Sequence, residues 1–208
     1  MKISLIEIQN FRKLQNCHID FDKEMTVLVG ANNSGKTSAM IALRKFFTSS
    51  KSIELRDISI GNWSTIVKIG IDWENEVQPQ HSLNELLPLL DTWLEVSLTK
   101  IHYIVHIIPD VNWAGGLIGV RLQYQVDDIE QLKNDYIKAR AKVKLIETGS
   151  KNESKPSISP RNLLEFLEKS LSKYLVLKAY SLNPEKLVHD QFNCSSKILR
   201  VSVSHLLS

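Results

Sequence analysis

Gly30, Gly35, Lys36 and Thr37 have the residue types and the spacing that could hold a chain of phosphate groups. They fill every fixed position of the pattern G-x-x-x-x-G-K-[ST], which forms phosphate-binding loops. The two glycines allow a backbone path that turns successive N–H groups toward an anion at the start of the next helix. Lys36 would reach the β- and γ-phosphates, and the Thr37 hydroxyl would bind Mg²⁺. The pattern therefore predicts a site for a nucleoside triphosphate.

The predicted nucleotide ligands all lie in or directly after this loop. They are Gly30, Asn32, Asn33, Ser34, Gly35, Lys36, Thr37 and Ser38. No Asn-Lys-x-Asp tetrapeptide, which recognises guanine, occurs in the chain. ATP with Mg²⁺ is therefore the expected cofactor, and Thr37 is the expected metal ligand. The alternative is that these residues form only a glycine turn between a strand and a helix, with Lys36 exposed to solvent. The pattern together with its flanking elements favours phosphate binding.

A strand before the loop and a helix after it must position these residues. Met25–Val29 is a continuous apolar run, which predicts a central strand covered on both faces. Apolar residues recur at helical spacing over Thr37–Phe47 and predict a helix with one buried face. Lys2–Gln9 and the alternating segment Cys17–Phe21 predict an opening pair of strands.

The remaining elements alternate between strands and helices. Consecutive short strands favour antiparallel pairing. Further strands are expected at Val67–Trp73, Thr92–Leu98, Ile101–Ile108, Leu117–Val126 and Tyr174–Tyr180, and helices at 82–88, 127–143 and 160–171. Thr148–Pro160 is polar and carries two prolines, so it predicts an exposed connection. We expect the phosphate loop and an antiparallel lobe in 1–147, a linker in 148–160, and a helix–strand continuation in 161–208.

Length and composition are those of an ordinary globular protein. The 208 residues carry a net charge of +3, with 43% hydrophobic and 24% charged residues, which is too mild an excess to identify nucleic acid as a partner. The apolar runs are far shorter than a membrane-spanning helix requires. The only cysteines, Cys17 and Cys194, predict neither a disulfide framework nor a zinc site. We expect a cytoplasmic protein that does not enter a membrane.

Several segments resemble known families. Ile6–Arg12, a second strand ending at Phe21-Asp22, and Val29–Thr37 resemble the ABC-type ATPase heads of RecF, RecN and SMC proteins. In those heads the arginine after the first strand lies beside the bound phosphates, so the resemblance implies a nucleotide contact for Arg12. Leu87–Val96, together with His102-Tyr103 and Trp113–Leu122, resembles ATP-dependent endonucleases of the overcoming-lysogenization-defect (OLD) family.

The resemblance implies an α/β fold of the P-loop NTPase class and ABC/SMC type, with a mixed sheet and an antiparallel β-lobe. Members of the OLD family couple such a head to a Toprim nuclease, and several act in defence against phage. The resemblance therefore implies ATP-driven association of heads as a homodimer or larger oligomer, and DNA as a partner of the whole protein. Small phosphotransferase activity and a non-catalytic, ATP-dependent interaction module remain open as alternatives.

The chain departs from these families in its catalytic segments. It has no Leu-Ser-Gly-Gly-like signature, no Toprim carboxylate cluster, and no apolar strand ending in Asp-Glu. Ile69–Glu74 and Ile107–Asp110 are poor substitutes for that carboxylate pair, because the first lacks adjacent carboxylates and the second has a proline within its strand. No catalytic residue is identified, so we expect an incomplete head that binds ATP but hydrolyses it poorly, as part of a larger protein or a truncated product.

Other residues could support different sites, but each has a simpler interpretation. The four tryptophans could stack on bases, although core packing is favoured. His102 and His106 have poor spacing for a metal on one strand. The basic run Lys138–Lys144 could contact DNA phosphates, although a solvated helix face is favoured.

Overall fold

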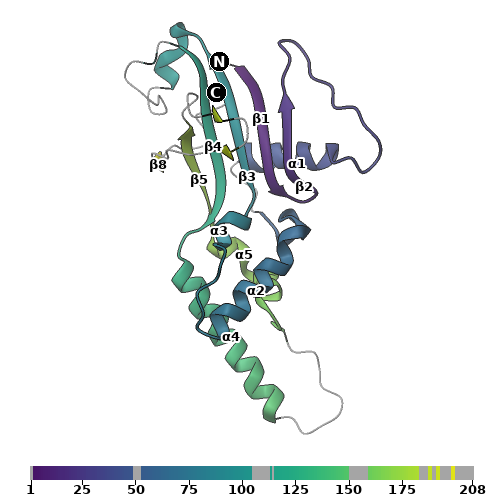
Figure 1. Ribbon diagram of the computed structural model, residues 1–208, viewed down its shortest axis with the longest axis vertical. Coiled ribbons are helices and arrows are strands. Elements are labelled where there is room, and N and C mark those ends of the chain that lie inside the picture. The colour runs from purple at the N-terminus through teal and green to yellow at the C-terminus, as the bar shows by residue number, and fades with distance from the viewer. Residues whose placement is uncertain are drawn as a thin grey trace.

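A computed structural model of the chain describes residues 2–48, 53–104, 113, 115–149 and 159–182, together with the short segments 187–188, 191–192 and 198–199. Figure 1 shows a twisted sheet at one end of the long axis and the helices α2, α4 and α5 at the other. The strands are β1 Lys2–Phe11, β2 Leu14–Asp20, β3 Leu89–Val96, β4 Gly116–Val126, β5 Leu175–Leu182, β6 Leu187–Val188, β7 Gln191–Phe192 and β8 Ile198–Leu199. The α-helices are α1 Lys36–Phe47, α2 Trp63–Glu74, α3 Leu83–Leu86, α4 Ile129–Gly149 and α5 Leu163–Tyr174. The short 3₁₀ helices are η1 Leu55–Asp57, η2 Ile60–Asn62 and η3 Leu98–Tyr103.

The main sheet has the strand order β2-β1-β3-β4-β5-β8, and every pair in it is antiparallel. This confirms the predicted opening hairpin and the antiparallel lobe. A mixed sheet was also expected, but the strands of the described ranges contain no parallel pair. The sheet that the structure describes is therefore the antiparallel part alone.

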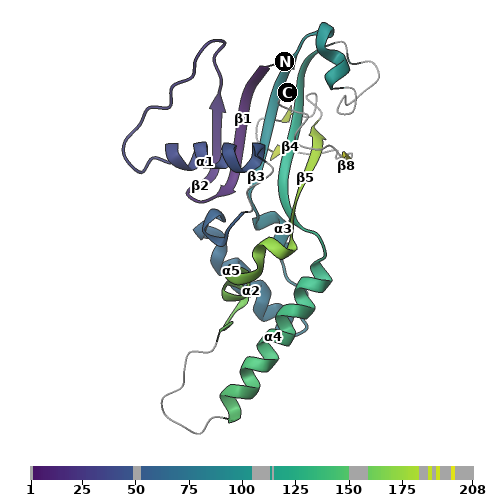
Figure 2. The same ribbon diagram turned by 180° about the vertical axis from the view of Figure 1, so that it is seen from behind.

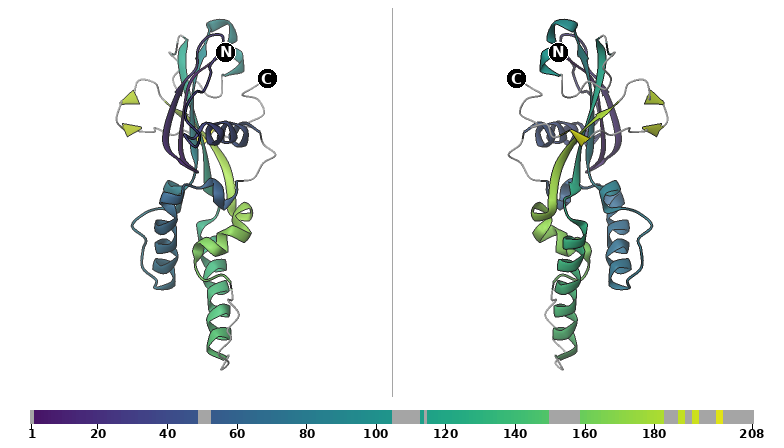
Figure 3. Two further views of the ribbon diagram at one scale, coloured as in Figure 1. Left: turned by 90° about the vertical axis from the view of Figure 1, so that its right-hand side faces the viewer. Right: turned by 90° about the vertical axis from the view of Figure 1, so that its left-hand side faces the viewer.

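Helix α1 covers one face of this sheet, as the side view in Figure 3 shows. Alternate residues of the strands, among them Ile6 and Ile8, turn toward it and are fully buried. Phe46 of α1 meets Tyr124 of β4 with their ring centroids 5.2 Å apart. The predicted helix after the phosphate loop is thus confirmed, and its core contacts fix its direction relative to β1.

Met25–Val29 is not the central strand that its apolar run predicts. The segment has no regular structure, and Met25, Val27 and Val29 are 75%, 64% and 87% exposed. Figure 1 shows it in the wide loop between β2 and α1, to the side of the sheet. A central strand needs a neighbour on each edge to satisfy its peptide groups. Among the described strands none lies beside this segment, and the prediction was therefore wrong for the structure.

Val67–Trp73 was expected to be a strand, but it lies within helix α2. The alternation of Val67, Ile69, Ile71 and Trp73 is short enough to coexist with a helical period. The buried positions of α2 are Ile66, Ile69, Gly70 and Trp73, which are spaced three and four residues apart, whereas Ile71 is 51% exposed. The alternation of four apolar residues was therefore weaker evidence for a strand than the three- and four-residue spacing was for a helix.

The other elements largely match the predictions. β3, β4, β5, α3 and α5 lie where strands and helices were expected, with ends shifted by a few residues. Residues 98–103 form η3 rather than a strand, and 105–108 lie outside the described residues. Helix α4 is capped by Asp128, whose carboxylate accepts a hydrogen bond from the Gln131 N–H at 2.9 Å. It continues to Gly149, while 150–158 of the predicted linker are not described.

The helical end of the molecule is a packed unit built from α2, α4 and α5, which Figure 2 shows from the opposite side. Glu74, at the end of α2, joins the first two of these helices. Its Oε1 accepts hydrogen bonds from the Tyr136 hydroxyl at 2.6 Å and from Arg140 Nε at 2.8 Å, and its Oε2 accepts one from Lys144 Nζ at 2.6 Å. Two cations of the basic run on α4, Arg140 and Lys144, therefore form intramolecular ion pairs with Glu74.

Replacing Glu74 by glutamine should weaken the fold in a pH-dependent way. Burial acts to raise the pKa of Glu74, but the hydrogen bonds from Arg140, Lys144 and Tyr136 lower it to about 2, against an ordinary 4.5. Because the folded-state pKa is the lower one, this stabilisation is present above pH 4.5 and is lost as the pH falls toward 2. We expect Glu74→Gln to reduce the free energy of unfolding at pH 7 by about 1–3 kcal/mol.

Urea unfolding of the two proteins between pH 7 and pH 2.5 would measure this difference. The difference in the free energy of unfolding between the wild type and Glu74→Gln should become smaller as the pH falls. A gap that stays constant over this range would contradict the role assigned to the Glu74 carboxylate.

Candidate functional site

The phosphate-binding pattern forms a tight turn that leads directly into α1. Asn33 and Gly35 have positive φ angles of 73° and 97°, and Gly35 caps the helix. A Cβ atom at Gly35 would lie 2.8 Å from Leu14 Cδ2, so space and backbone geometry both favour glycine there. The N–H groups of the first turn of α1 have no earlier helical carbonyl to bind. The loop therefore places donors and the positive end of a helix dipole at one point.

The Lys36 ammonium lies within the loop to which it belongs. It donates to the carbonyl oxygens of Gly30 and Ala31, the latter at 2.7 Å, and to the Ser34 hydroxyl at 3.2 Å. A lysine ammonium has three donors, and these contacts use all three. A phosphate oxygen that binds Lys36 must therefore replace at least one of these acceptors.

The loop lines one wall of a cavity of about 550 Å³. The residues that line it are Arg12, Lys13, Asn32, Asn33, Ser34, Gly35, Lys36, Thr37, Ser38, Arg56 and Ile60. Four of these side chains are basic, namely Arg12, Lys13, Lys36 and Arg56, and the described lining contains no acidic one. The positive charge of this lining therefore favours the binding of an anion with several negative charges.

Most of the residues predicted from the sequence meet at this cavity. Asn32–Ser38 line it, and Arg12 reaches it from the turn between β1 and β2. Gly30 does not line the cavity, but its carbonyl oxygen accepts a hydrogen bond from the Lys36 ammonium. A Cβ atom at Gly30 would lie 2.9 Å from Ser34 Oγ, so a side chain there would crowd the loop. The structure thus brings Arg12 and the loop together, although nearly twenty positions separate them in the chain.

The sequence did not reveal three residues of the cavity: Lys13, Arg56 and Ile60. Lys13 follows Arg12, and its ammonium donates to the Asn33 side chain across the pocket. Its position beside a predicted ligand was the one signal that could have found it. Arg56 and Ile60 come from the segment after α1, which carries no recognisable motif. Arg56 is 72% exposed and pairs with Glu54 at 2.7 Å.

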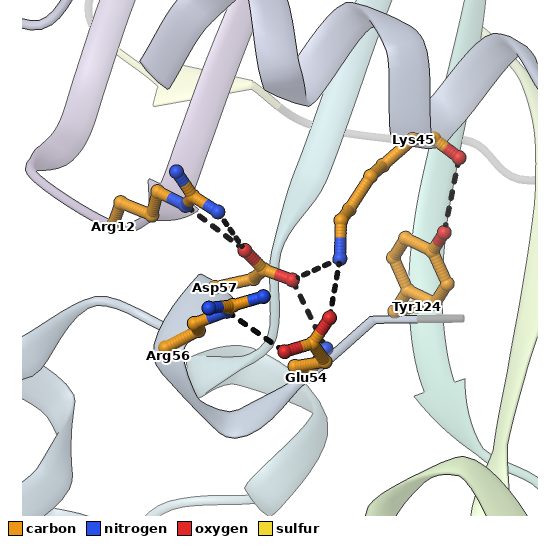
Figure 4. Close-up of polar contacts among 6 residues, drawn as sticks. All are labelled: Arg12, Lys45, Glu54, Arg56, Asp57 and Tyr124. Carbon is orange, nitrogen blue, oxygen red and sulfur yellow. Dashed lines mark hydrogen bonds and ion pairs between the residues drawn. The ribbon is translucent and has the colours of Figure 1, made fainter. Parts of the chain in front are cut away.

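A buried carboxylate lies behind the cavity wall. Asp57 is fully buried, and its side chain accepts from Arg12 and from Lys45 near the end of α1, as Figure 4 shows. Burial acts to raise the pKa of Asp57, but the hydrogen bonds from Lys45, the Glu54 amide and Arg12 hold it below its usual range. Asp57 is therefore a stable anion among cations, and it cannot serve as a proton donor near neutral pH.

The other segments considered from the sequence lie away from this cavity. Ile69–Glu74 lies on α2, and Ile107–Asp110 is outside the described residues. Trp93 is 1% exposed and Trp73 is 5% exposed, which supports core packing for these two. Within the described parts of the chain, no group of three or more His, Cys, Asp or Glu side chains could hold a metal ion. No described helix is both long and apolar enough to cross a membrane.

The cavity fits a magnesium–nucleotide complex on its own chemistry. Its lining contains a glycine turn at a helix N-terminus and four basic side chains, and Thr37 supplies a hydroxyl oxygen of the kind that binds Mg²⁺. A family model described as an AAA ATPase domain matches residues 1–204, nearly the whole chain. A search of curated proteins found no match.

Proposed function

Because the chain belongs to the AAA ATPase domain family, we propose that it binds ATP with Mg²⁺ in the cavity at the start of α1. One observation carries this proposal: the phosphate-binding turn and four basic side chains from three separate segments line a single cavity. A site for a neutral ligand would not need this concentration of positive charge. The family implies a nucleotide and, usually, Mg²⁺.

Each group of the cavity has a distinct part in holding the nucleotide. The amides of the loop and of the first turn of α1 bind phosphate oxygens. Lys36 exchanges a loop carbonyl for the β- and γ-phosphates, and the Thr37 hydroxyl holds Mg²⁺. Arg12 contacts the outer phosphates from the opposite wall. Bound Mg²⁺ would neutralise charge on the phosphate oxygens.

We further propose that the chain is an ABC-type head of the OLD family. The segments that resemble this family lie largely on β3 and β4, the central strands of the antiparallel sheet beside α1. In such heads ATP joins two copies, so ATP would control the association of this head or a nuclease that is supplied elsewhere. Hydrolysis needs a carboxylate that orients water, and the described lining has none. We therefore propose slow turnover by the chain alone.

Calorimetric titration with Mg²⁺-ATP, ADP and AMP would test the binding proposal. If the turn and its cations hold the β- and γ-phosphates, AMP should bind at least roughly tenfold more weakly than ATP. GTP at the same concentrations tests the preference for adenine. Equal affinities for ATP and AMP would show that the phosphate chain is not the group recognised.

Sedimentation with and without Mg²⁺-ATP, followed by product analysis with labelled ATP, would separate the functional alternatives. Association with slow release of phosphate is the result expected for an ABC-type head. Transfer of the label to a small acceptor would instead indicate a phosphotransferase. Association with no phosphate release at all would indicate a non-catalytic module.

A further inference from the structure

Groups from three parts of the chain converge on the carboxylate of Asp57. Arg12 comes from the turn after β1, Lys45 from the last turns of α1, and Glu54 from the residue before η1. Figure 4 shows Arg12 and Lys45 approaching Asp57 from opposite sides. Asp57 is fully buried, although the Arg12 side chain that it holds is 25% exposed and lines the nucleotide cavity. The buried Asp57 carboxylate thus anchors the long Arg12 side chain, which could otherwise adopt many conformations.

Arg12 is attached to Asp57 through both its backbone and its guanidinium. Its N–H donates to the Asp57 carbonyl at 2.9 Å, and its Nε and Nη2 lie 2.9 and 2.8 Å from Asp57 Oδ1. Arg12 has a positive φ of 52°, a conformation that a non-glycine residue adopts at a cost. The third guanidinium nitrogen, Nη1, makes no hydrogen bond to a described residue. Asp57 therefore holds the guanidinium along its Nε–Nη2 edge, and the N–H groups of Nη1 can still donate hydrogen bonds to an anion.

The other carboxylate oxygen connects this arrangement to the helix that follows the phosphate loop. Asp57 Oδ2 accepts from Lys45 and from the Glu54 N–H, the latter at 3.0 Å. Lys45 is 10% exposed at its side chain, and its own carbonyl accepts the Tyr124 hydroxyl at 3.2 Å. Since Lys36 and Thr37 begin the same helix, the position of Arg12 is fixed relative to them through Asp57 and Lys45.

We propose that Asp57 is a positioning residue of the nucleotide site, and that it holds the Arg12 guanidinium where the outer phosphates bind. This inference rests on the proposed function and adds to it a residue that would never touch the ligand. An arginine that is oriented before binding loses less side-chain freedom when the ligand arrives, which increases affinity. An arginine that must be freed from Asp57 before it can bind phosphate would have the opposite effect on affinity.

Calorimetry with Mg²⁺-ATP on Arg12→Ala, Asp57→Asn and the double variant would test the inference. Each single change should weaken binding roughly tenfold, the size expected for one charge-assisted contact. The double variant should be no weaker than either single one, because both changes remove the same contact. A merely structural role for Asp57 would not produce this non-additivity.

Glu74→Gln provides the matched control, since Glu74 also holds an arginine and a lysine, in a cluster that does not line the cavity. Its affinity for ATP should equal that of the wild type. Arg12→Lys covers the case in which Asp57→Asn does not fold. A lysine ammonium cannot bind Asp57 along one edge while offering further planar donors to a phosphate, so this variant should bind ATP as weakly as Arg12→Ala.

Wild-type or higher affinity of Asp57→Asn would overturn the inference, as would wild-type affinity of Arg12→Lys. The failure of the proposed function is distinguished by Lys36→Ala. If that variant binds ATP as the wild type does, the site assignment itself is wrong. If it loses binding while Asp57→Asn and Arg12→Lys keep theirs, only the positioning role is wrong.

Discussion

Replacing Lys36 by alanine should weaken Mg²⁺-ATP binding by about a hundredfold or more. The Lys36 ammonium lies inside the loop, bound to the carbonyls of Gly30 and Ala31, and Lys36 lines the cavity in which we propose that the phosphates bind. In the proposed site, its loss would remove a charge-assisted contact to two phosphate groups at once. Hydrogen bonds to charged groups are worth about 1.5–3 kcal/mol each, which corresponds to roughly ten- to hundredfold in affinity for one contact.

The matched comparison is Lys13→Ala, because Lys13 lines the same cavity but is exposed and contacts the Asn33 side chain. That variant should lose affinity only a few-fold, since an exposed charge contributes less. Calorimetric titration of both variants at one ionic strength measures the two effects, and circular dichroism checks that the fold is retained. Equal losses in the two variants would mean that overall charge, rather than the loop, binds the nucleotide.

Replacing Gly119 by valine should destabilise the sheet by about 3 kcal/mol or more. Gly119 lies on β4 directly opposite Trp93 of β3 and Leu182 of β5. A Cβ atom there would lie 2.6 Å from the Trp93 ring and 2.7 Å from Leu182 Cβ, and both of these side chains are buried. Neither neighbour can move aside without opening the packing between central strands, so even the first added carbon strains the structure.

Thermal unfolding followed by circular dichroism would measure this effect, with an expected fall in Tm of roughly 6–12 °C for a chain of this size. Gly61→Val is the control. Its Cβ would lie 2.7 Å from the end of the Gln15 side chain, which is exposed and can turn away. A loss of stability in Gly61→Val as large as that in Gly119→Val would show that the Trp93 contact is not the cause.

Local patterns predicted those elements that carry a regular stripe of apolar residues or a short connecting turn. The β1–β2 hairpin and helices α1 and α5 each bury a regular stripe, and the structure has them where the stripes occur. The two main errors concern segments whose local pattern predicted a strand that the structure does not contain. Met25–Val29 has the composition of a central strand but is exposed, and Val67–Trp73 alternates like a strand but forms α2. In both cases the outcome depended on neighbours that a short window does not contain.

The sequence by itself determined the phosphate-binding turn, because its conformation depends on the glycines within it and on the helix that starts directly after it. The family resemblance implied that Arg12 lies beside the turn, but only the tertiary structure showed that Lys13 and Arg56 line the same cavity and that Asp57 holds Arg12. The end of β1 meets the segment after α1 through a bridge between Phe11 and Ile58 and a hydrogen bond from the Arg12 N–H to the Asp57 carbonyl, and this contact brings Arg12 together with Arg56 and Asp57. Burial alone would raise the pKa of Asp57, but the hydrogen bonds from Lys45, the Glu54 amide and Arg12 keep it an anion. Arg12 and Lys45 reach the carboxylate only because the fold brings their segments to it, and no local motif around Asp57 encodes that meeting.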